Sequence, residues 1–172
     1  MDIGCRKLGW LMALLLLSVT AAVVYAVARF SVDRAVEYSD REERFKYSST
    51  GGERASGFPY WIWQALPEVC ADKLPGKGYD SLGLIFEPGK DLPIGVSKRR
   101  VTGMDRVFPN CAACHASTVR DTPQSVPRIV LGMPANTLDL AGFKNFFFDS
   151  VNYACYSPYD LVPEIYDVSQ RA

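Results

Sequence analysis

The amino-acid sequence opens with one long apolar run between charged residues. Arg6 and Lys7 precede twenty-one uncharged residues, 8–28, after which charged residues return. A helix of this length measures about 30 Å, the thickness of the hydrocarbon core of a bilayer. The basic pair favours a cytoplasmic N-terminus, and Ala-Val-Ala at 26–28 fits a signal-peptide cleavage site. Residues 1–28 are therefore predicted to be a transmembrane anchor, a removable signal peptide or, as the plainest alternative, a buried core helix.

Polar residues dominate the next part of the chain, and apolar residues return after it. The segment 29–56 is rich in charged residues and ends in Gly and Ser, which predicts a polar tether or a solvated helix. The compact domain is expected to begin near Gly57 and to comprise residues 57–172.

Within the domain, apolar residues at three- and four-residue steps predict one clear helix. Asn136 or Thr137 is expected to cap it, and its stripe consists of Leu140, Phe143, Phe147, Val151 and Ala154. Residues 79–108 contain short apolar stretches separated by Gly and Pro, which predict loops with one hairpin. Residues 157–168 fit a last short helix. The predicted fold class is mostly α, with irregular loops and one short hairpin.

The composition is typical of one globular domain and does not favour a nucleic-acid-binding protein. The chain has 172 residues, about one domain's length, with 19 basic and 19 acidic side chains and a net charge of zero. No nucleic-acid partner is expected, because such proteins concentrate positive charge.

The five cysteines fall into three groups if the residues after the apolar run lie outside the cytoplasm. Cys5 would stay on the cytoplasmic side or in the removed peptide. Cys70 and Cys155 are predicted to form a disulfide, because an oxidising compartment favours their pairing. Such a bond would stabilise the fold by about 4 kcal/mol by constraining the unfolded chain. Two independent buried thiols are the alternative.

The remaining two cysteines stand directly before the only histidine of the chain. Cys111-Ala-Ala-Cys114-His115 has the C-x-x-C-H spacing of covalent c-type haem attachment. On a helix, a three-residue step brings both thiols to one face, where they would form thioethers with the porphyrin. His115 would bind the iron as proximal ligand, and Asn110 is a suitable N-cap. The predicted cofactor is one covalently attached haem c.

Three other interpretations of this motif are weaker. A thioredoxin-like C-x-x-C would need a βαβ pattern, which the sequence does not suggest. A structural zinc site would recruit all four exported cysteines, but zinc spacing does not call for a histidine directly after the second cysteine. A plain Cys111–Cys114 disulfide is the third alternative.

The ligand opposite His115 decides between electron transfer and ligand-binding chemistry. Met133 is the best protein candidate and Met104 a weaker one; the other options are an open or water-bound site, or Tyr or Lys. A thioether ligand raises the reduction potential and suits electron transfer, whereas an open site permits peroxide or oxygen chemistry. Arg120 is either a partner for a haem propionate or a plain surface arginine.

Several further motifs are particular to one group of haem proteins. They are PYWIW at 59–63, LPG-x-GY at 74–79, and NCAACH at 110–115 followed by TVR. With these motifs, residues 45–167 resemble the first haem region of bacterial dihaem c-type cytochromes. Those cytochromes are similar to the rubber oxygenases and, more distantly, to the dihaem cytochrome c peroxidases.

The resemblance implies a cytochrome c-like haem domain in which Cys111 and Cys114 hold the porphyrin and His115 binds the iron. In many small cytochromes c, a proline carbonyl about a dozen residues downstream accepts the second ring N–H of the imidazole. This resemblance nominates Pro127, twelve residues after His115; Pro123 and Pro134 also lie downstream, and the alternative is that Pro127 only shapes a loop. The dihaem proteins are longer and have a second C-x-x-C-H, which this sequence lacks. The chain is therefore expected to be a fragment, a one-haem relative, or a split-gene product with a second haem-bearing chain as partner.

Together these inferences predict a c-type cytochrome domain that passes single electrons to a redox partner protein. Its predicted location is the periplasmic side of the bacterial inner membrane, where it is anchored through residues 8–28 or secreted. The alternative function is the haem module of a peroxidase- or oxygenase-like enzyme with an open distal site.

Overall fold

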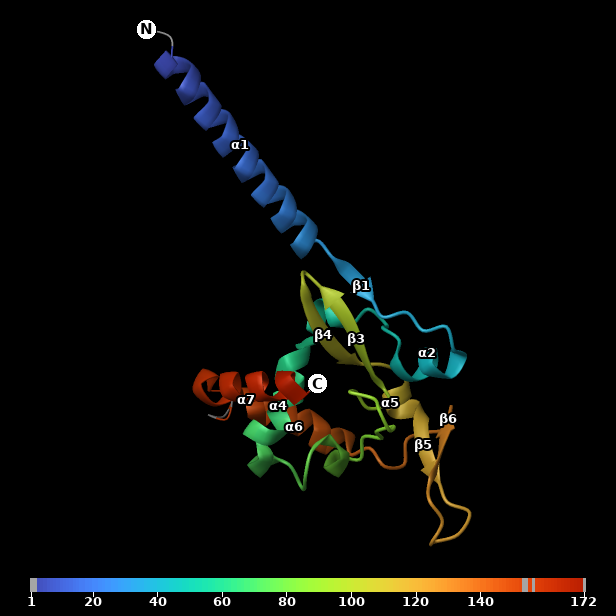
Figure 1. The fold of residues 1–172 in the computed structure, drawn as a ribbon. Coiled ribbons are helices and arrows are strands. Elements are labelled where there is room, and N and C mark those ends of the chain that lie inside the picture. Colours follow the sequence, from blue (N-terminus) through green and yellow to red (C-terminus); the bar gives the residue numbers. More distant parts are fainter. Residues whose placement is uncertain (1–2, 153–154, 156, 172) are drawn as a thin grey trace.

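The computed structural model describes residues 3–152, 155 and 157–171. Its first element is the straight helix α1 (Ile3–Phe30), which projects away from the rest of the molecule (Figure 1). Within Lys7–Phe30 of this helix, an 18-residue window has a mean hydropathy of 2.4, and none of that window is buried. A buried core helix is therefore excluded. By length and composition the helix is able to cross a membrane, as an anchor or as a signal segment.

The remaining elements form a small sheet, a separate hairpin and a group of helices (Figure 1). In chain order they are β1 (Asp33–Ala35), α2 (Arg41–Tyr47), α3 (Glu53–Ser56), β2 (Phe58–Pro59), α4 (Tyr60–Val69), the 3₁₀ turns η1 (Ala71–Lys73) and η2 (Tyr79–Leu82), β3 (Val96–Val101), β4 (Met104–Pro109), α5 (Ala112–His115), β5 (Ala116–Val119), β6 (Arg128–Leu131), α6 (Leu140–Asn152) and α7 (Pro158–Arg171).

The predicted hairpin is confirmed, and it forms the centre of an antiparallel sheet with the order β1-β3-β4-β2. Strands β3 and β4 pair from Val96 opposite Pro109 to Val101 opposite Met104. The turn between them consists of Thr102 and Gly103, which both have positive φ angles. This two-residue turn suits the right-handed twist of the strands, so it closes the hairpin tightly.

The prediction of a mostly α fold is wrong, because the described chain is mixed α/β. A four-stranded sheet and the two-stranded β5–β6 sheet accompany the helices. The segment 29–56 also contributes to the sheet: Asp33 pairs with Val101 in β1–β3, and the Glu53 side chain of α3 is fully buried. Polar side chains of segment 29–56 bind partners inside the domain. The polar composition of this segment therefore did not reveal that it joins the sheet.

The main core lies where α4 and α6 meet the sheet. Trp63 of α4 stacks on Tyr79 with 4.2 Å between ring centroids, and Phe147 of α6 lies 5.3 Å from Trp63. The predicted Cys70–Cys155 disulfide is present, with 5.4 Å between the Cα atoms, and links the end of α4 to the segment after α6. Aromatic packing and a cross-link therefore act on the same part of the molecule.

Both predicted C-terminal helices are present, but the cap of the first differs from the prediction. Helix α6 begins at Leu140, and the Asp139 carboxylate accepts the Gly142 backbone N–H at 2.8 Å. Asn136 instead exchanges two hydrogen bonds with the backbone of Thr118. Of the predicted apolar stripe, Ala154 lies outside the described residues. The final helix, α7, extends the predicted segment by three residues at its C-terminal end.

Candidate functional site

The C-x-x-C-H motif forms the short helical turn α5 directly after β4. Asn110, the residue before the turn, caps it as the sequence predicts: its Oδ1 accepts the Ala112 backbone N–H at 2.9 Å. The Asn110 Nδ2 donates to the carbonyl oxygens of Lys46 at 3.2 Å and Ser48 at 3.1 Å. One side chain therefore starts the turn and attaches it to the end of α2.

A glycine allows the turn to approach the loop before β3. Gly95 has φ +90, and a Cβ atom built on it would lie 2.2 Å from the Ala113 nitrogen. Its backbone N–H donates to Lys46 O at 2.9 Å, and its carbonyl accepts the Asn110 N–H at 2.8 Å. Only glycine tolerates both this conformation and this contact. The Lys46 carbonyl, Gly95 and Asn110 thus form a backbone frame around the motif.

The two faces of the turn differ in exposure. Ala112 and Ala116 are buried and pack with Tyr47 and Ile94 in a small second core. Cys111 and Cys114 are free and exposed, and His115 is exposed beside them. The space beneath α5 has a volume of about 10 Å³, which holds one water molecule at most. A large ligand therefore has access only to the outer face.

The hairpin after the motif brings the loop that contains Met133 back to it. Strands β5 and β6 pair from Ala116 opposite Leu131, and the Gly132 N–H then donates to His115 O at 2.8 Å. The Ala135 N–H donates to Cys114 O at 2.9 Å. Met133, between these two contacts, is 44% exposed. Backbone geometry places its Cα within about 10 Å of the His115 Cα.

The other sequence candidates lie farther from the motif. The β5–β6 register pairs Val119 with Arg128, so Pro127, directly before β6, lies at the far end of the hairpin, about 17 Å along the strand from His115. Arg120 donates to the Ser125 carbonyl in the same distal loop. Met104 begins β4 at the tip of the other hairpin. The structure therefore brings Met133, but neither Pro127 nor Met104, close to the motif.

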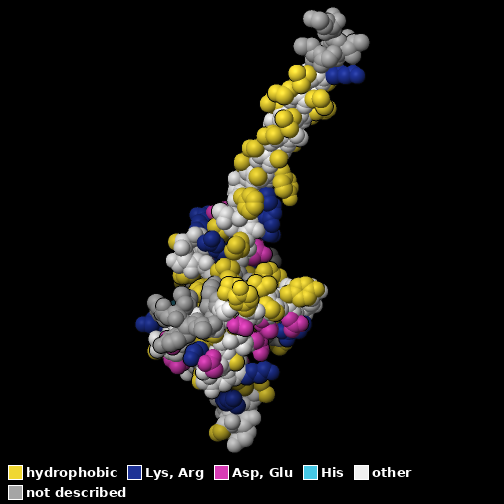
Figure 2. All heavy atoms as spheres, turned by 90° about the vertical axis from the view of Figure 1, so that its left-hand side faces the viewer, with side chains coloured by type: hydrophobic (Ala, Val, Ile, Leu, Met, Phe, Trp, Pro, Cys, Tyr) yellow, Lys and Arg dark blue, Asp and Glu magenta, His cyan; other side chains and the backbone are white. Residues whose placement is uncertain are grey.

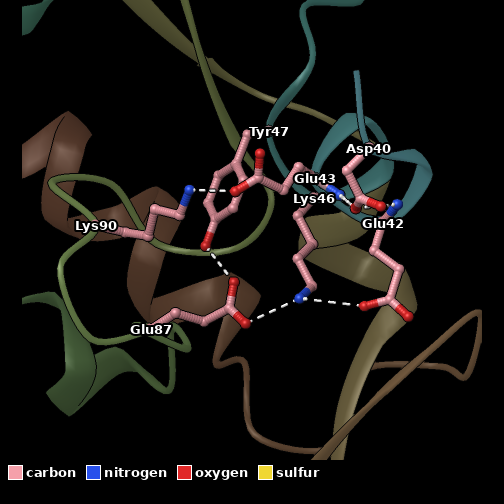
Figure 3. Close-up of polar contacts among 7 residues, drawn as sticks. All are labelled: Asp40, Glu42, Glu43, Lys46, Tyr47, Glu87 and Lys90. Atoms are coloured by element: carbon pink, nitrogen blue, oxygen red, sulfur yellow. Dashed lines mark hydrogen bonds and ion pairs between the residues drawn. The ribbon is translucent and has the colours of Figure 1, made fainter. Parts of the chain in front are cut away.

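Charged side chains hold α2, and through it the motif, against the loop after η2. Figure 3 shows Glu87 accepting hydrogen bonds from Lys46 Nζ at 2.8 Å and from Tyr47 Oη at 2.6 Å. Burial opposes ionisation of Glu87, but these two donors outweigh it and lower the Glu87 pKa below its ordinary value. Burial, together with the Glu87 carboxylate, raises the pKa of Tyr47. Glu87 is therefore the charged centre of this contact.

The state of the cysteines weakens the alternatives to haem attachment. Cys70 and Cys155 are joined to each other, so a zinc site built from all four thiols after α1 is not available. Within the described residues, no three His, Cys, Asp or Glu side chains converge as metal ligands. Cys111 and Cys114 are not joined in a disulfide. A covalent haem needs only two free thiols and one imidazole from this turn, and this donor set fits that group.

No known protein family matches the chain, and neither a curated protein nor a solved structure matches it. The site therefore has to be interpreted from its own chemistry.

Sequence reasoning found the motif and its cap but missed the groups that hold it in place. Gly95 stands in an ordinary loop sequence, and the Lys46 carbonyl belongs to a segment assigned to the tether. A backbone carbonyl has no sequence signature, so only the folded structure could assign this role. The sequence nominated Asn136 as a helix cap, but in the structure its side chain holds the segment after β6 against Thr118 of β5.

Proposed function

We propose that the chain is a membrane-anchored c-type cytochrome domain that transfers single electrons on the periplasmic side of the membrane. Cys111 and Cys114 form the thioether bonds to one haem c, and His115 is the proximal iron ligand. When bound, the haem supplies an iron centre that accepts and releases one electron. The protein holds the porphyrin edge at α5 and donates the imidazole, while a redox partner protein exchanges the electron.

The observation that carries the proposal is the division of the exported cysteines into two chemical states. Cys70 and Cys155 pair, as an oxidising compartment allows. Cys111 and Cys114 stay free and exposed on one helical turn next to the only histidine. Thiols kept free in this setting suit a covalent modification better than a structural role.

The decisive experiment is expression of the full chain together with cytochrome c maturation factors. We expect the purified protein to give a pyridine haemochrome spectrum and a mass increased by one haem. A Cys111→Ser, Cys114→Ser variant should lose covalent haem, whereas Cys70→Ser, Cys155→Ser serves as the matched control and should retain it in the folded fraction. A colourless wild-type protein of unmodified mass would refute the proposal.

A haem module with an open distal face is the second candidate, and the exposure of the motif favours it. His115 lies at the surface, and an accessible sixth position binds small ligands. Such a site predicts a high-spin spectrum that changes when cyanide or peroxide is added. A carrier in which Met133 is the sixth iron ligand predicts a low-spin spectrum that changes only slowly when cyanide or peroxide is added. If Met133→Ala leaves the spectrum unchanged, Met133 is not a ligand.

A further inference from the structure

A pocket of about 580 Å³ lies on strands β1 and β3, close to the C-terminal end of α1 and away from the haem motif. Its basic lining residues are Arg34 of β1 and Lys98 and Arg100 of β3, and its acidic ones are Glu37 and Asp105. Figure 2 shows Lys and Arg side chains gathered around the base of the helix. The pocket therefore combines excess positive charge with a position next to an apolar helix.

The basic side chains of the pocket are not equally neutralised. Arg34 and Arg100 stand directly opposite each other in the β1–β3 pairing, and like charges in this arrangement repel. Asp105 lies 3.7 Å from Arg100, and Lys98 pairs with Asp91 at 2.7 Å. The Arg34 side chain makes no hydrogen bond or ion pair with the described residues. An anion between the two guanidinium groups would remove this repulsion, and guanidinium groups bind phosphate oxygens in pairs.

The sheet is held at a defined position relative to the helix. Arg29 Nη1 donates to Gly103 O at 3.1 Å, and the Thr102 N–H donates to Val32 O at 3.1 Å. The tip of the β3–β4 hairpin therefore touches the point where α1 ends. Arg100 is three residues, about 10 Å, from Gly103, and arginine side chains extend toward a membrane surface.

The same end of the domain also exposes apolar side chains. Phe30, at the end of α1, is 61% exposed, and Met104, next to the hairpin turn, is 49% exposed. If residues 8–28 fill the hydrocarbon core, these side chains reach the headgroup layer, which extends roughly 5–7 Å beyond it on each side. Exposed apolar side chains beside a basic pocket, which long arginine side chains connect to the membrane surface, match the chemistry of an anionic lipid.

We propose that the pocket between β1 and β3 binds the phosphate headgroup of an anionic phospholipid through Arg34 and Arg100. Asp105 holds Arg100 in place, while Lys98 stays paired with Asp91. The bound lipid fixes the orientation of the domain on the membrane surface. This inference rests on retention of α1 as an anchor, which is part of the proposed function, and it does not depend on haem.

The test uses the full chain in neutral detergent micelles, titrated with phosphatidylglycerol, phosphatidylcholine or inorganic phosphate while unfolding temperature is measured. A ligand that binds only the folded protein raises this temperature in a saturable way. We expect phosphatidylglycerol to do so and the other two to have little effect. Equal stabilisation by phosphatidylcholine or by phosphate would overturn the proposal, because the site would not select an anionic lipid.

Two pairs of substitutions locate the effect. Arg34→Gln with Arg100→Gln should weaken the apparent affinity for phosphatidylglycerol roughly thirtyfold, given the usual contribution of two basic residues at a membrane surface. Arg41→Gln with Lys77→Gln removes the same charge from exposed positions elsewhere and should bind like the wild type. Wild-type affinity in the first pair, or equal losses in both, would overturn the proposal.

Two more measurements distinguish loss of lipid binding from a folding defect and from loss of haem. Arg34→Lys with Arg100→Lys should bind more tightly than the glutamine pair but more weakly than the wild type, because the charge remains while the paired guanidinium hydrogen bonds are lost. A mass spectrum of the chain extracted from membranes should show residues 1–28 still attached. A cleaved chain would overturn the lipid proposal, whereas the haemochrome spectrum would still decide the haem proposal independently.

Discussion

The two buried clusters of the domain are stabilised by different kinds of interaction. The larger one is built around Trp63, which stacks on Tyr79, and Phe146, which meets Tyr79 edge to face; it lies beside the Cys70–Cys155 disulfide. The smaller one, beneath α5, contains two alanines, Tyr47 and Ile94, and depends on the hydrogen bonds of Asn110 and Gly95. The difference indicates that the aromatic half supplies most of the folding free energy, while the motif half supplies a precise backbone position.

Replacing the central aromatic residue should have the largest effect. Trp63→Ala removes a side chain that is 3% exposed and should lower the free energy of unfolding by about 3–5 kcal/mol. Urea denaturation followed by circular dichroism measures this loss. Trp61→Ala is the control, because Trp61 is 37% exposed. Similar losses in both variants would show that the ring cluster is not the main source of stability.

Removal of the disulfide should rank second. Cys70→Ser with Cys155→Ser releases a link between residues 85 positions apart and should reduce stability by about 2–4 kcal/mol, because the unfolded chain gains freedom. The same urea experiment measures it. Haem content per folded molecule should not change, since the bond lies outside the motif half. A loss of haem from the folded fraction would show that the two halves are coupled.

A substitution in the motif half should act through backbone position. Gly95→Ala introduces a Cβ atom that meets the Ala113 backbone at 2.2 Å, and we expect a loss of about 2–3 kcal/mol with a lower haem yield. Gly89→Ala is the matched control: Gly89 has φ +77, but nothing lies within 4 Å of the added atom. It should lose only about 1 kcal/mol. Equal losses of stability in the two variants would mean that α5 can shift away from residue 95 at no cost in folding free energy.

The smallest effect concerns the charged contact that holds α2. The Glu87 pKa is below its ordinary value in the folded protein, so its ionised form stabilises the fold above the unfolded pKa of about 4.3. This contribution is lost as the pH falls through the folded pKa. Glu87→Gln should therefore be about 1–2 kcal/mol less stable than wild type at pH 7, and the difference should shrink below about pH 4.3. Urea denaturation between pH 7 and 3 checks this, and a difference independent of pH would contradict it.

The sequence predicted the elements whose signals are local. The apolar run of α1, the stripe of α6, the hairpin and the capped C-x-x-C-H turn each depend on residues close together in the chain. The expectation of an oxidising compartment, with two thiols left over outside the motif, was enough to predict the Cys70–Cys155 pair. The fold class was wrong because β1 and β2 contain three and two residues, too few to show a strand periodicity.

The surroundings of the motif could not be predicted in the same way. The frame that holds it comes from α2, from the loop before β3 and from the segment after β6, which lie far apart in sequence. Its contacts are largely backbone hydrogen bonds, and backbone groups are the same in every residue except proline. The resemblance to small cytochromes c nominates Pro127, but the register of β5–β6 places it at the far end of the hairpin from His115.

The sequence by itself determined which chemical groups stand together in the motif: two thiols and one imidazole within five consecutive residues. Local spacing and helix geometry are sufficient for that. The tertiary structure alone decided which face of the turn is exposed and that Arg34 lies opposite Arg100 near the C-terminal end of α1. These outcomes depend on chain segments that become neighbours only when the apolar core forms and the strands align.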